Sequence, residues 1–127
     1  MSTQRFCGFA MMVGLSAIGC GGSDSLAPSQ ACKAVADGLC DRFYACFTAA
    51  EISDAMLPAT EAACVTMFET DFSCAQQTVA NTCSTGAYHG DQASLCADQL
   101  HGLACSTVRD PNFDQATAAP ACAKVCS

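Results

Sequence analysis

The cysteine content constrains this chain more than any other feature of the sequence. Twelve of its 127 residues are cysteines, and ten of them lie in the last 97 residues, a density of about 10% that is typical of exported, disulfide-stabilised domains. These ten are Cys32, Cys40, Cys46, Cys64, Cys74, Cys83, Cys96, Cys105, Cys122 and Cys126. Their even number predicts five structural disulfides formed in an oxidising compartment, and the spacing leaves their pairing open.

Metal binding and thiol-redox catalysis are the competing uses of cysteine. Zinc sites and thioredoxin-like sites use C-x-x-C pairs, and the sequence contains none, since its closest pair is Cys122 and Cys126. His89 and His101 lack the H-x3–5-H spacing of a zinc site. We therefore expect disulfides, with no metal and no cofactor, and keep a thiol-redox or metal-handling protein as the alternative.

The two remaining cysteines belong to an N-terminal export signal. Arg5 is followed by an uncharged, mostly apolar stretch, residues 6–18, which fits a signal peptide and is shorter than the roughly 20 residues that span a bilayer. Residues 17–20, Ala-Ile-Gly-Cys, resemble the lipobox of bacterial lipoproteins, with Ala17 where Leu is commonest. The resemblance implies that residues 1–19 are removed together with Cys7, and that Cys20 becomes the lipidated N-terminus.

Lipidation sets the expected location. Stable membrane anchoring takes at least two acyl chains, and a lipoprotein cysteine carries more than one. Gly21, and not an aspartate, follows Cys20, which in Gram-negative lipoproteins implies sorting to the outer membrane. We expect an exported cell-envelope protein whose partners are the membrane, through its lipid anchor, and a further envelope protein.

Composition divides the rest of the chain into a tether and one domain. Residues 20–30 comprise Cys20 and a Gly-, Ser- and Pro-containing segment, in which Pro28 is expected to stop a helix. Ten such residues reach roughly 18 Å as a flexible coil. Residues 31–127 suffice for one small domain.

Charge excludes two classes of partner. The chain from Cys20 onward has four basic and twelve acidic residues, a net charge near −8, and no basic cluster. Nucleic-acid binding and electrostatic docking on anionic lipid are therefore disfavoured. Because the acids are spread along the chain, we interpret them as a solvated surface.

The domain is predicted to be all-α, a small disulfide-stapled fold of about four to five helices. Apolar residues recur at helical spacing, and no stretch alternates with a period of two. Helices are expected over residues 31–48, 60–74, 76–83 and 91–105, with a short turn at 53–57 and a last helix after Pro120. Ser53, Thr60 and Asp91 are the expected N-caps. The first helix carries three cysteines and should be linked to several neighbours.

Four segments carry a family resemblance: GLCDRFYACFTAAE, AACV, AYHGDQASLCADQL and PACAKVC. They are similar to segments of small cysteine-rich lipoproteins and secreted proteins that are abundant in myxobacteria. The resemblance implies a cell-envelope location and a disulfide-bonded helical fold. It brings no assigned activity and no catalytic residues.

Fragments of other sites have simpler explanations. Asp110, Asn112 and Asp114 match the first ligands of a calcium loop, but the Gly and Glu that complete such a loop are missing, so we expect a polar turn. Asp37 and Asp41 lie four residues apart on one helix and should face solvent. An enzyme or accessory factor of a lipid-associated pathway stays a third hypothesis, which an acidic cleft around His89 or His101 would favour. We predict no catalytic residues.

Overall fold

A computed structural model describes residues 25–127. The predicted signal peptide, Cys20 and residues 21–24 of the predicted tether lie outside the described residues. In chain order the helices are α1 (Pro28–Cys46), α2 (Ala49–Asp54), α3 (Glu61–Asp71), the 3-10 helix η1 (Cys74–Gln76), α4 (Val79–Thr82), α5 (Gly90–His101), α6 (Cys105–Val108), α7 (Gln115–Ala118) and the 3-10 helix η2 (Cys122–Lys124).

The described part of the chain confirms the all-α prediction. It contains no β-strand, and its only bridge is an isolated antiparallel one between Tyr88 and Cys126. Seven α-helices replace the expected four to five, because three of them, α4, α6 and α7, are single turns of four residues. Within these residues no helix is long and apolar enough to cross a membrane.

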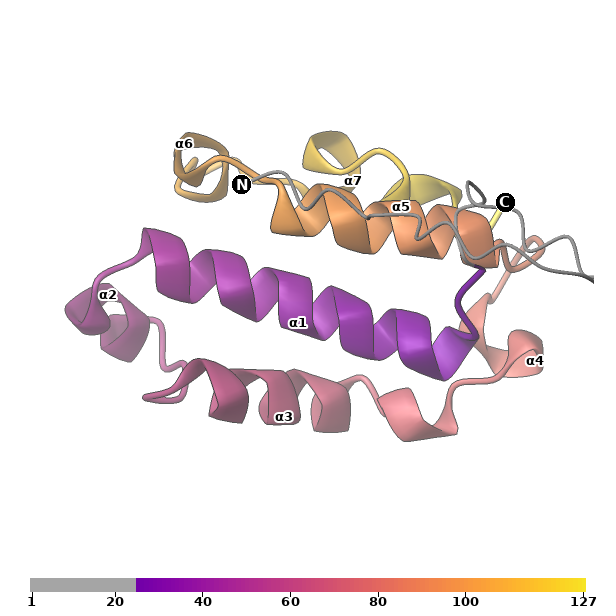
Figure 1. Ribbon diagram of the computed structural model, residues 1–127, viewed down its shortest axis with the longest axis horizontal. Coiled ribbons are helices and arrows are strands. Elements are labelled where there is room, and N and C mark those ends of the chain that lie inside the picture. The colour runs from indigo at the N-terminus through magenta and orange to yellow at the C-terminus, as the bar shows by residue number, and fades with distance from the viewer. Residues whose placement is uncertain (1–24) are drawn as a thin grey trace, which may run out of the picture.

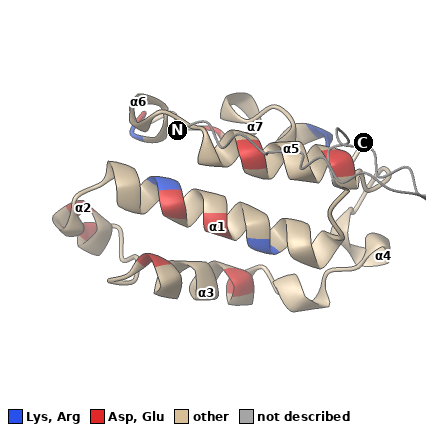
Figure 2. Ribbon diagram, in the orientation of Figure 1, with Lys and Arg blue, Asp and Glu red and all other residues tan. Residues whose placement is uncertain are grey.

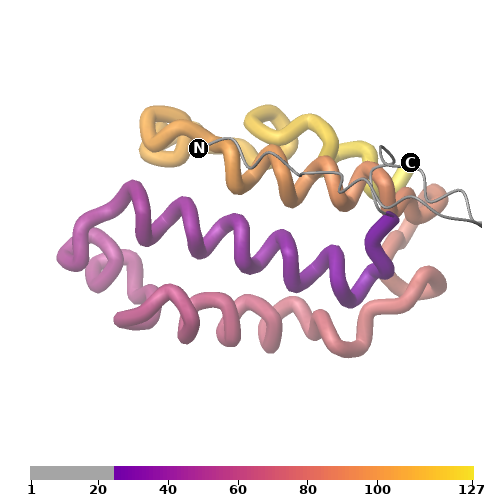
Figure 3. Tube along the Cα trace, in the orientation of Figure 1, coloured from indigo at the N-terminus to yellow at the C-terminus, as the bar shows by residue number. Residues whose placement is uncertain are grey.

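The long helix α1 lies between α3 and α5 and forms the middle layer of the domain (Figures 1 and 3). Small buried residues on α1, Ala36 and Gly38, allow this close packing. A Cβ atom built on Gly38 would lie 3.2 Å from Leu100 Cβ on α5. Leu39 and Leu100 occupy the core that forms between the two helices.

Five disulfides join the layers, as predicted. They are Cys32–Cys74, Cys40–Cys64, Cys46–Cys105, Cys83–Cys126 and Cys96–Cys122. The first two are nested and link α1 to η1 and α3. The last two are nested and close the C-terminal part of the chain. Cys46–Cys105 crosses both nested pairs and links α1 to α6, so α1 is bonded to three different neighbours, as its three cysteines predicted.

Helix α1 begins earlier than expected. Pro28, expected to stop a helix, is its first residue, so the last three residues of the predicted tether belong to α1. Proline suits this position because the first helical N–H has no intrahelical acceptor. The backbone N–H of Ala27 donates to Gln30 Oε1 over 3.2 Å, which helps to fix the start of the helix.

Cap positions are partly as predicted. Thr60 accepts a hydrogen bond from the Ala63 N–H and caps α3, as expected. Ser53 is not a cap: α2 starts after Thr48, which forms a reciprocal capping box with Glu51. Asp91 lies in the first turn of α5 and does not cap it.

Three predicted helices are also shorter than expected. The helix expected over residues 60–74 ends at Asp71, and Cys74 lies in the separate 3-10 helix η1. Helix α5 ends at His101, before Cys105, which starts α6 as a separate turn. The helix expected over residues 76–83 is reduced to α4. Cys122 and Cys126, expected one turn apart on one helix, bond to Cys96 and Cys83 respectively, with only the 3-10 helix η2 between them.

Candidate functional site

All ten cysteines of the described residues are in disulfides, so none of them is a free thiol. Cys40 and Cys64 are fully buried, whereas Cys105 and Cys126 are exposed. Thiolate chemistry requires a deprotonated sulfur, and a sulfur bonded in a disulfide cannot supply one. The predicted cysteine residues therefore form a covalent framework and no nucleophilic site.

His101 lies between the two carboxylates that the sequence placed on the first helix. Its Nε2 is 3.4 Å from Asp37 Oδ2 and its Nδ1 is 3.5 Å from Asp41 Oδ2. The two carboxylates contact opposite ring nitrogens, so the three groups cannot converge on one ion. Asp41 also pairs with Arg42 at 2.8 Å. Across the described residues, no group of three or more His, Cys, Asp or Glu side chains could hold a metal ion. The cluster ties α5 to α1.

The partial calcium-loop motif, Asp110, Asn112 and Asp114, forms a polar turn and a helix cap. Asp110 Oδ1 accepts a hydrogen bond from the Asn112 N–H over 2.8 Å. Asp114 Oδ1 accepts one from the Thr117 N–H over 2.7 Å, which caps α7 and lowers the pKa of Asp114. Both carboxylates are thus occupied by backbone donors.

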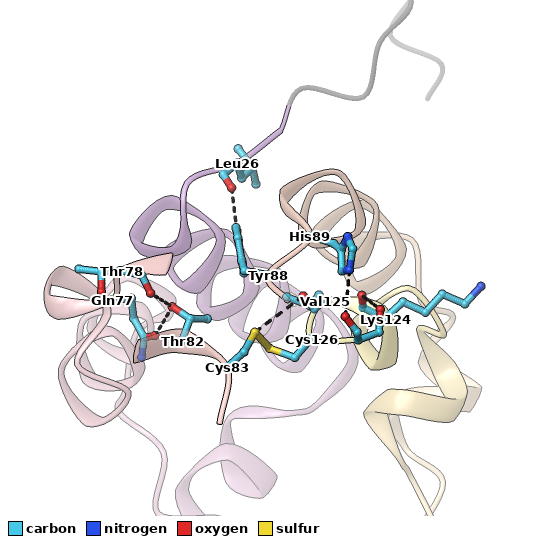
Figure 4. Close-up of a disulfide and its surroundings, with 11 residues drawn as sticks. Leu26, Gln77, Thr78, Thr82, Cys83, Tyr88, His89, Lys124, Val125 and Cys126 are labelled. Carbon is cyan, nitrogen blue, oxygen red and sulfur yellow. Dashed lines mark hydrogen bonds between the residues drawn. A yellow bond between two sulfur atoms is a disulfide. The ribbon is translucent and has the colours of Figure 1, made fainter. Parts of the chain in front are cut away.

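The chain enters the domain along a fixed path, where the predicted tether meets α1. The Leu26 N–H donates to Gly90 O over 3.1 Å, and the Tyr88 hydroxyl donates to Leu26 O over 2.7 Å (Figure 4). A Cβ atom on Gly90 would lie 2.3 Å from Ser25 Oγ and 2.6 Å from Leu26 O. Only glycine at position 90 allows this close approach of two backbone segments.

An apolar cavity opens beside this entry point. We define the tether end of the domain as residues 26–28 together with residues 72–90. A cavity of about 350 Å³ lies there between the first turns of α1, the α4 segment and Val125, with Pro28, Val35, Phe72 and Tyr88 among its lining residues. This volume is at the small end of the range of ligand pockets, which are mostly apolar.

The opposite end of the domain carries a second cavity. We define the α2 end as α2 together with residues 55–59. Tyr44, Ile52, Met56 and Leu57 are among the residues that line a cavity of about 420 Å³ there. Met56 has a left-handed backbone (φ 56°) and a side chain that is 90% exposed. The Tyr44 hydroxyl donates to Pro58 O and fastens this loop to α1.

Arg109 joins the α2 end to the rest of the domain. Its guanidinium pairs with both Glu51 carboxylate oxygens, at 2.5 and 3.2 Å, and donates to Cys46 O at 2.7 Å. It also lies 5.0 Å from the centre of the Phe47 ring, within the range of a cation–π contact. The hydrogen bond from Arg109, together with those from Thr48, lowers the pKa of Glu51 to about 2.

Sequence reasoning missed the tether contact and both cavities. Tyr88 and Gly90 precede the helix that was expected to begin with Asp91 as its cap, and their contacts are with Leu26, which lies far away in sequence. One signal was available: residues 72–90 form a run of 19 residues without Asp, Glu, Lys or Arg. In an acidic chain such a run indicates a surface that is uncharged, unlike the rest of the domain. A scan of protein-family models, a search of curated proteins and a search of solved structures each found no significant match for this chain.

Proposed function

We propose that this chain is a lipid-anchored protein of the bacterial cell envelope, whose disulfide-stabilised helical domain serves as a binding or structural module. The observation that carries the proposal is the use of the cysteines. All ten between residues 31 and 127 are bonded within one domain. Such a framework persists in oxidising compartments outside the cytoplasm.

The sequence before the domain supports the anchor. Residues 6–18 have the length and composition of a signal peptide, and residues 17–20 resemble a lipobox. With ten cysteines bonded to one another, Cys20 has no partner to find within the domain and is available for lipid. The resemblance to cysteine-rich lipoproteins of myxobacteria, and Gly21 after Cys20, favour the outer membrane.

A thiol-redox or metal-handling lipoprotein is less well supported. Redox exchange and zinc binding both need thiolates, and every described cysteine is bonded to another. The His101 carboxylate cluster, which the enzyme hypothesis could use, has its ring nitrogens facing different carboxylates. The binding or structural module requires neither free thiols nor converging ligands.

The test is an intact mass of the protein extracted from membranes of a bacterial host that processes lipoproteins. The sample is measured with and without a thiol-alkylating reagent under non-reducing conditions. We expect a chain that begins at Cys20, is heavier by a diacylglycerol and an acyl group, and gains no alkyl adduct. The matched control is Cys20→Ser, which should lose the lipid mass and leave the membrane fraction.

Two results would contradict the proposal. A chain that starts at another residue, or that carries no lipid, excludes the anchor. Two or more alkyl adducts on the protein alkylated without reduction would exclude the closed framework and favour the thiol-redox or metal-handling alternative.

A further inference from the structure

The tether end differs in charge from the rest of the domain. Residues 72–90 carry no acidic or basic side chain, although twelve acids are distributed over the chain. In Figure 2 α4 is accordingly tan throughout, while red acidic residues mark α1, α2, α3 and α5. Phe72 and Val79 in this segment are 46% and 68% exposed. An exposed apolar patch without charge is typical of an interaction surface.

Charged residues of both signs border this neutral surface, with Asp71 next in sequence to the lining residue Phe72 and two lysines next to other lining residues. Lys33 and Lys124 are each next in sequence to a residue that lines the tether-end cavity, Cys32 and Val125. Both are exposed, and neither forms an ion pair with any carboxylate between residues 25 and 127. The two other cations of the domain, Arg42 and Arg109, are already paired with acids. Among residues 25–127, the basic side chains without an ion pair are therefore the two lysines beside the tether end.

The tether end is also the end that a lipid on Cys20 would hold at a bilayer. Ser25 is the fifth residue after Cys20, so the two are at most about 18 Å apart at 3.3–3.6 Å per residue. Leu26 is then fixed to Tyr88 and Gly90, so the link emerges beside the cavity. The α2 end lies beyond the 19 residues of α1, a helix about 28 Å long at 1.5 Å per residue.

We propose that the tether end rests on the surface of the bilayer that anchors Cys20, with Phe72 and Val79 against the lipid and the cavity open to acyl chains. The inference rests on the proposed lipidation. A short tether keeps the surface at a high effective concentration near the membrane, so a weak apolar contact is enough. Lys33 and Lys124 border this contact together with Asp71 and Asp91, so its attraction to the bilayer is apolar and not electrostatic. The acidic α2 end with Glu51 and Asp54 then points away from the membrane.

The two tyrosines of the chain allow a direct test. The protein has no tryptophan, Tyr88 lines the tether-end cavity and Tyr44 lines the cavity at the α2 end. The lipidated Tyr44→Phe protein, its lipid confirmed by mass, is reconstituted in phosphatidylethanolamine–phosphatidylglycerol vesicles containing a lipid brominated near its headgroup. We expect a loss of Tyr88 emission relative to vesicles without bromine.

Two further substitutions in the Tyr44→Phe background separate docking from mere proximity. Val79→Asp places a charge on the proposed contact and should restore Tyr88 emission; Asp is well tolerated at the first position of a helix such as α4. Met56→Asp, at an even more exposed position at the other end, should leave the quenching unchanged, and Asp accepts the left-handed backbone at this position.

Distinct results overturn the inference and the function on which it rests. A lipidated protein whose Tyr88 emission is unaffected by bromine, or in which Val79→Asp and Met56→Asp act alike, excludes docking through the tether end and leaves the lipid anchor intact. A protein whose mass shows no lipid overturns the proposed function and this inference with it.

Discussion

The Tyr88 hydroxyl donates to the carbonyl oxygen of Leu26 over 2.7 Å and so connects residues 62 positions apart in the sequence. Partial burial raises the pKa of Tyr88, so the phenol keeps the proton that it donates throughout the neutral range. The entry of the chain into the domain is therefore fixed by a half-buried donor on the loop before α5. The direction from which the predicted tether approaches follows from this contact.

Gly90→Ala is expected to detach residues 25–27 from the loop before α5. The added Cβ would lie 2.3 Å from Ser25 Oγ and 2.6 Å from Leu26 O, so the backbone of residues 25–27 must move away. Hydrogen exchange of the Leu26 amide, which donates to Gly90 O, should become markedly faster. Gly102→Ala is the matched control, because its Cβ would lie at 3.5 Å or more from its neighbours. Equal exchange rates in both variants would show that Gly90 does not hold the entry point.

Removing Cys46–Cys105, the disulfide that crosses the two nested pairs, should lower the free energy of unfolding the most, because it closes the longest loop in the unfolded chain. Cys46 and Cys105 are 59 residues apart, whereas Cys40 and Cys64 are 24 apart. In the chain-entropy description the crossing disulfide contributes about 4 kcal/mol to the free energy of unfolding. We expect the double variant Cys46→Ala/Cys105→Ala to lose about that much in urea unfolding at neutral pH. A loss below about 1 kcal/mol would mean that noncovalent contacts between α1 and α6 suffice.

The disulfides should open in the order of their exposure. Cys126 and Cys105 are exposed, whereas both sulfurs of Cys40–Cys64 are fully buried between α1 and α3. A reductant attacks an accessible sulfur directly but reaches a buried one only when the structure opens. Brief treatment with a phosphine, followed by alkylation and peptide mapping, should label the pairs of Cys126 and Cys105 first and Cys40–Cys64 last. Early labelling of Cys40 would contradict the close packing of α3 on α1.

The Glu51–Arg109 pair makes stability depend on acid pH. Arg109 and the capping box lower the pKa of Glu51 from 4.5 to about 2 in the folded chain. The unfolded chain therefore binds the proton more readily, so the contribution of Glu51 is complete above pH 4.5 and is lost as the pH falls toward 2. We expect the thermal midpoint to fall over this interval. Glu51→Gln should flatten that dependence, while Glu69→Gln, a carboxylate on α3 outside these ion pairs, should leave it as in the wild type. A Glu51→Gln protein with the wild-type acid transition would assign the effect to other carboxylates.

Local chemistry explains which features could be predicted. Thr60 caps α3 as expected, because an N-cap depends only on a hydroxyl and the N–H groups of the next turn. Thr48 was overlooked in favour of Ser53, although Thr48 and Glu51 have the spacing of a capping box. Pro28 was interpreted as a helix stop, although proline also suits a first helical turn. These two errors are local, and a stricter use of the same rules corrects them.

The sequence by itself determined that the described domain is helical and that its even set of ten cysteines closes as disulfides, since helical periodicity and cysteine density depend on residues near one another in the chain. The tertiary structure alone decided the pairing. Cys122 and Cys126 are close in sequence yet bond to Cys96 and Cys83, because the packing of separate segments determines which sulfurs meet. The contacts of Leu26 with Tyr88 and Gly90 are equally nonlocal. A core built largely of small side chains leaves few sequence signals for such contacts, and only the folded arrangement of α1 and α5 brings these residues together.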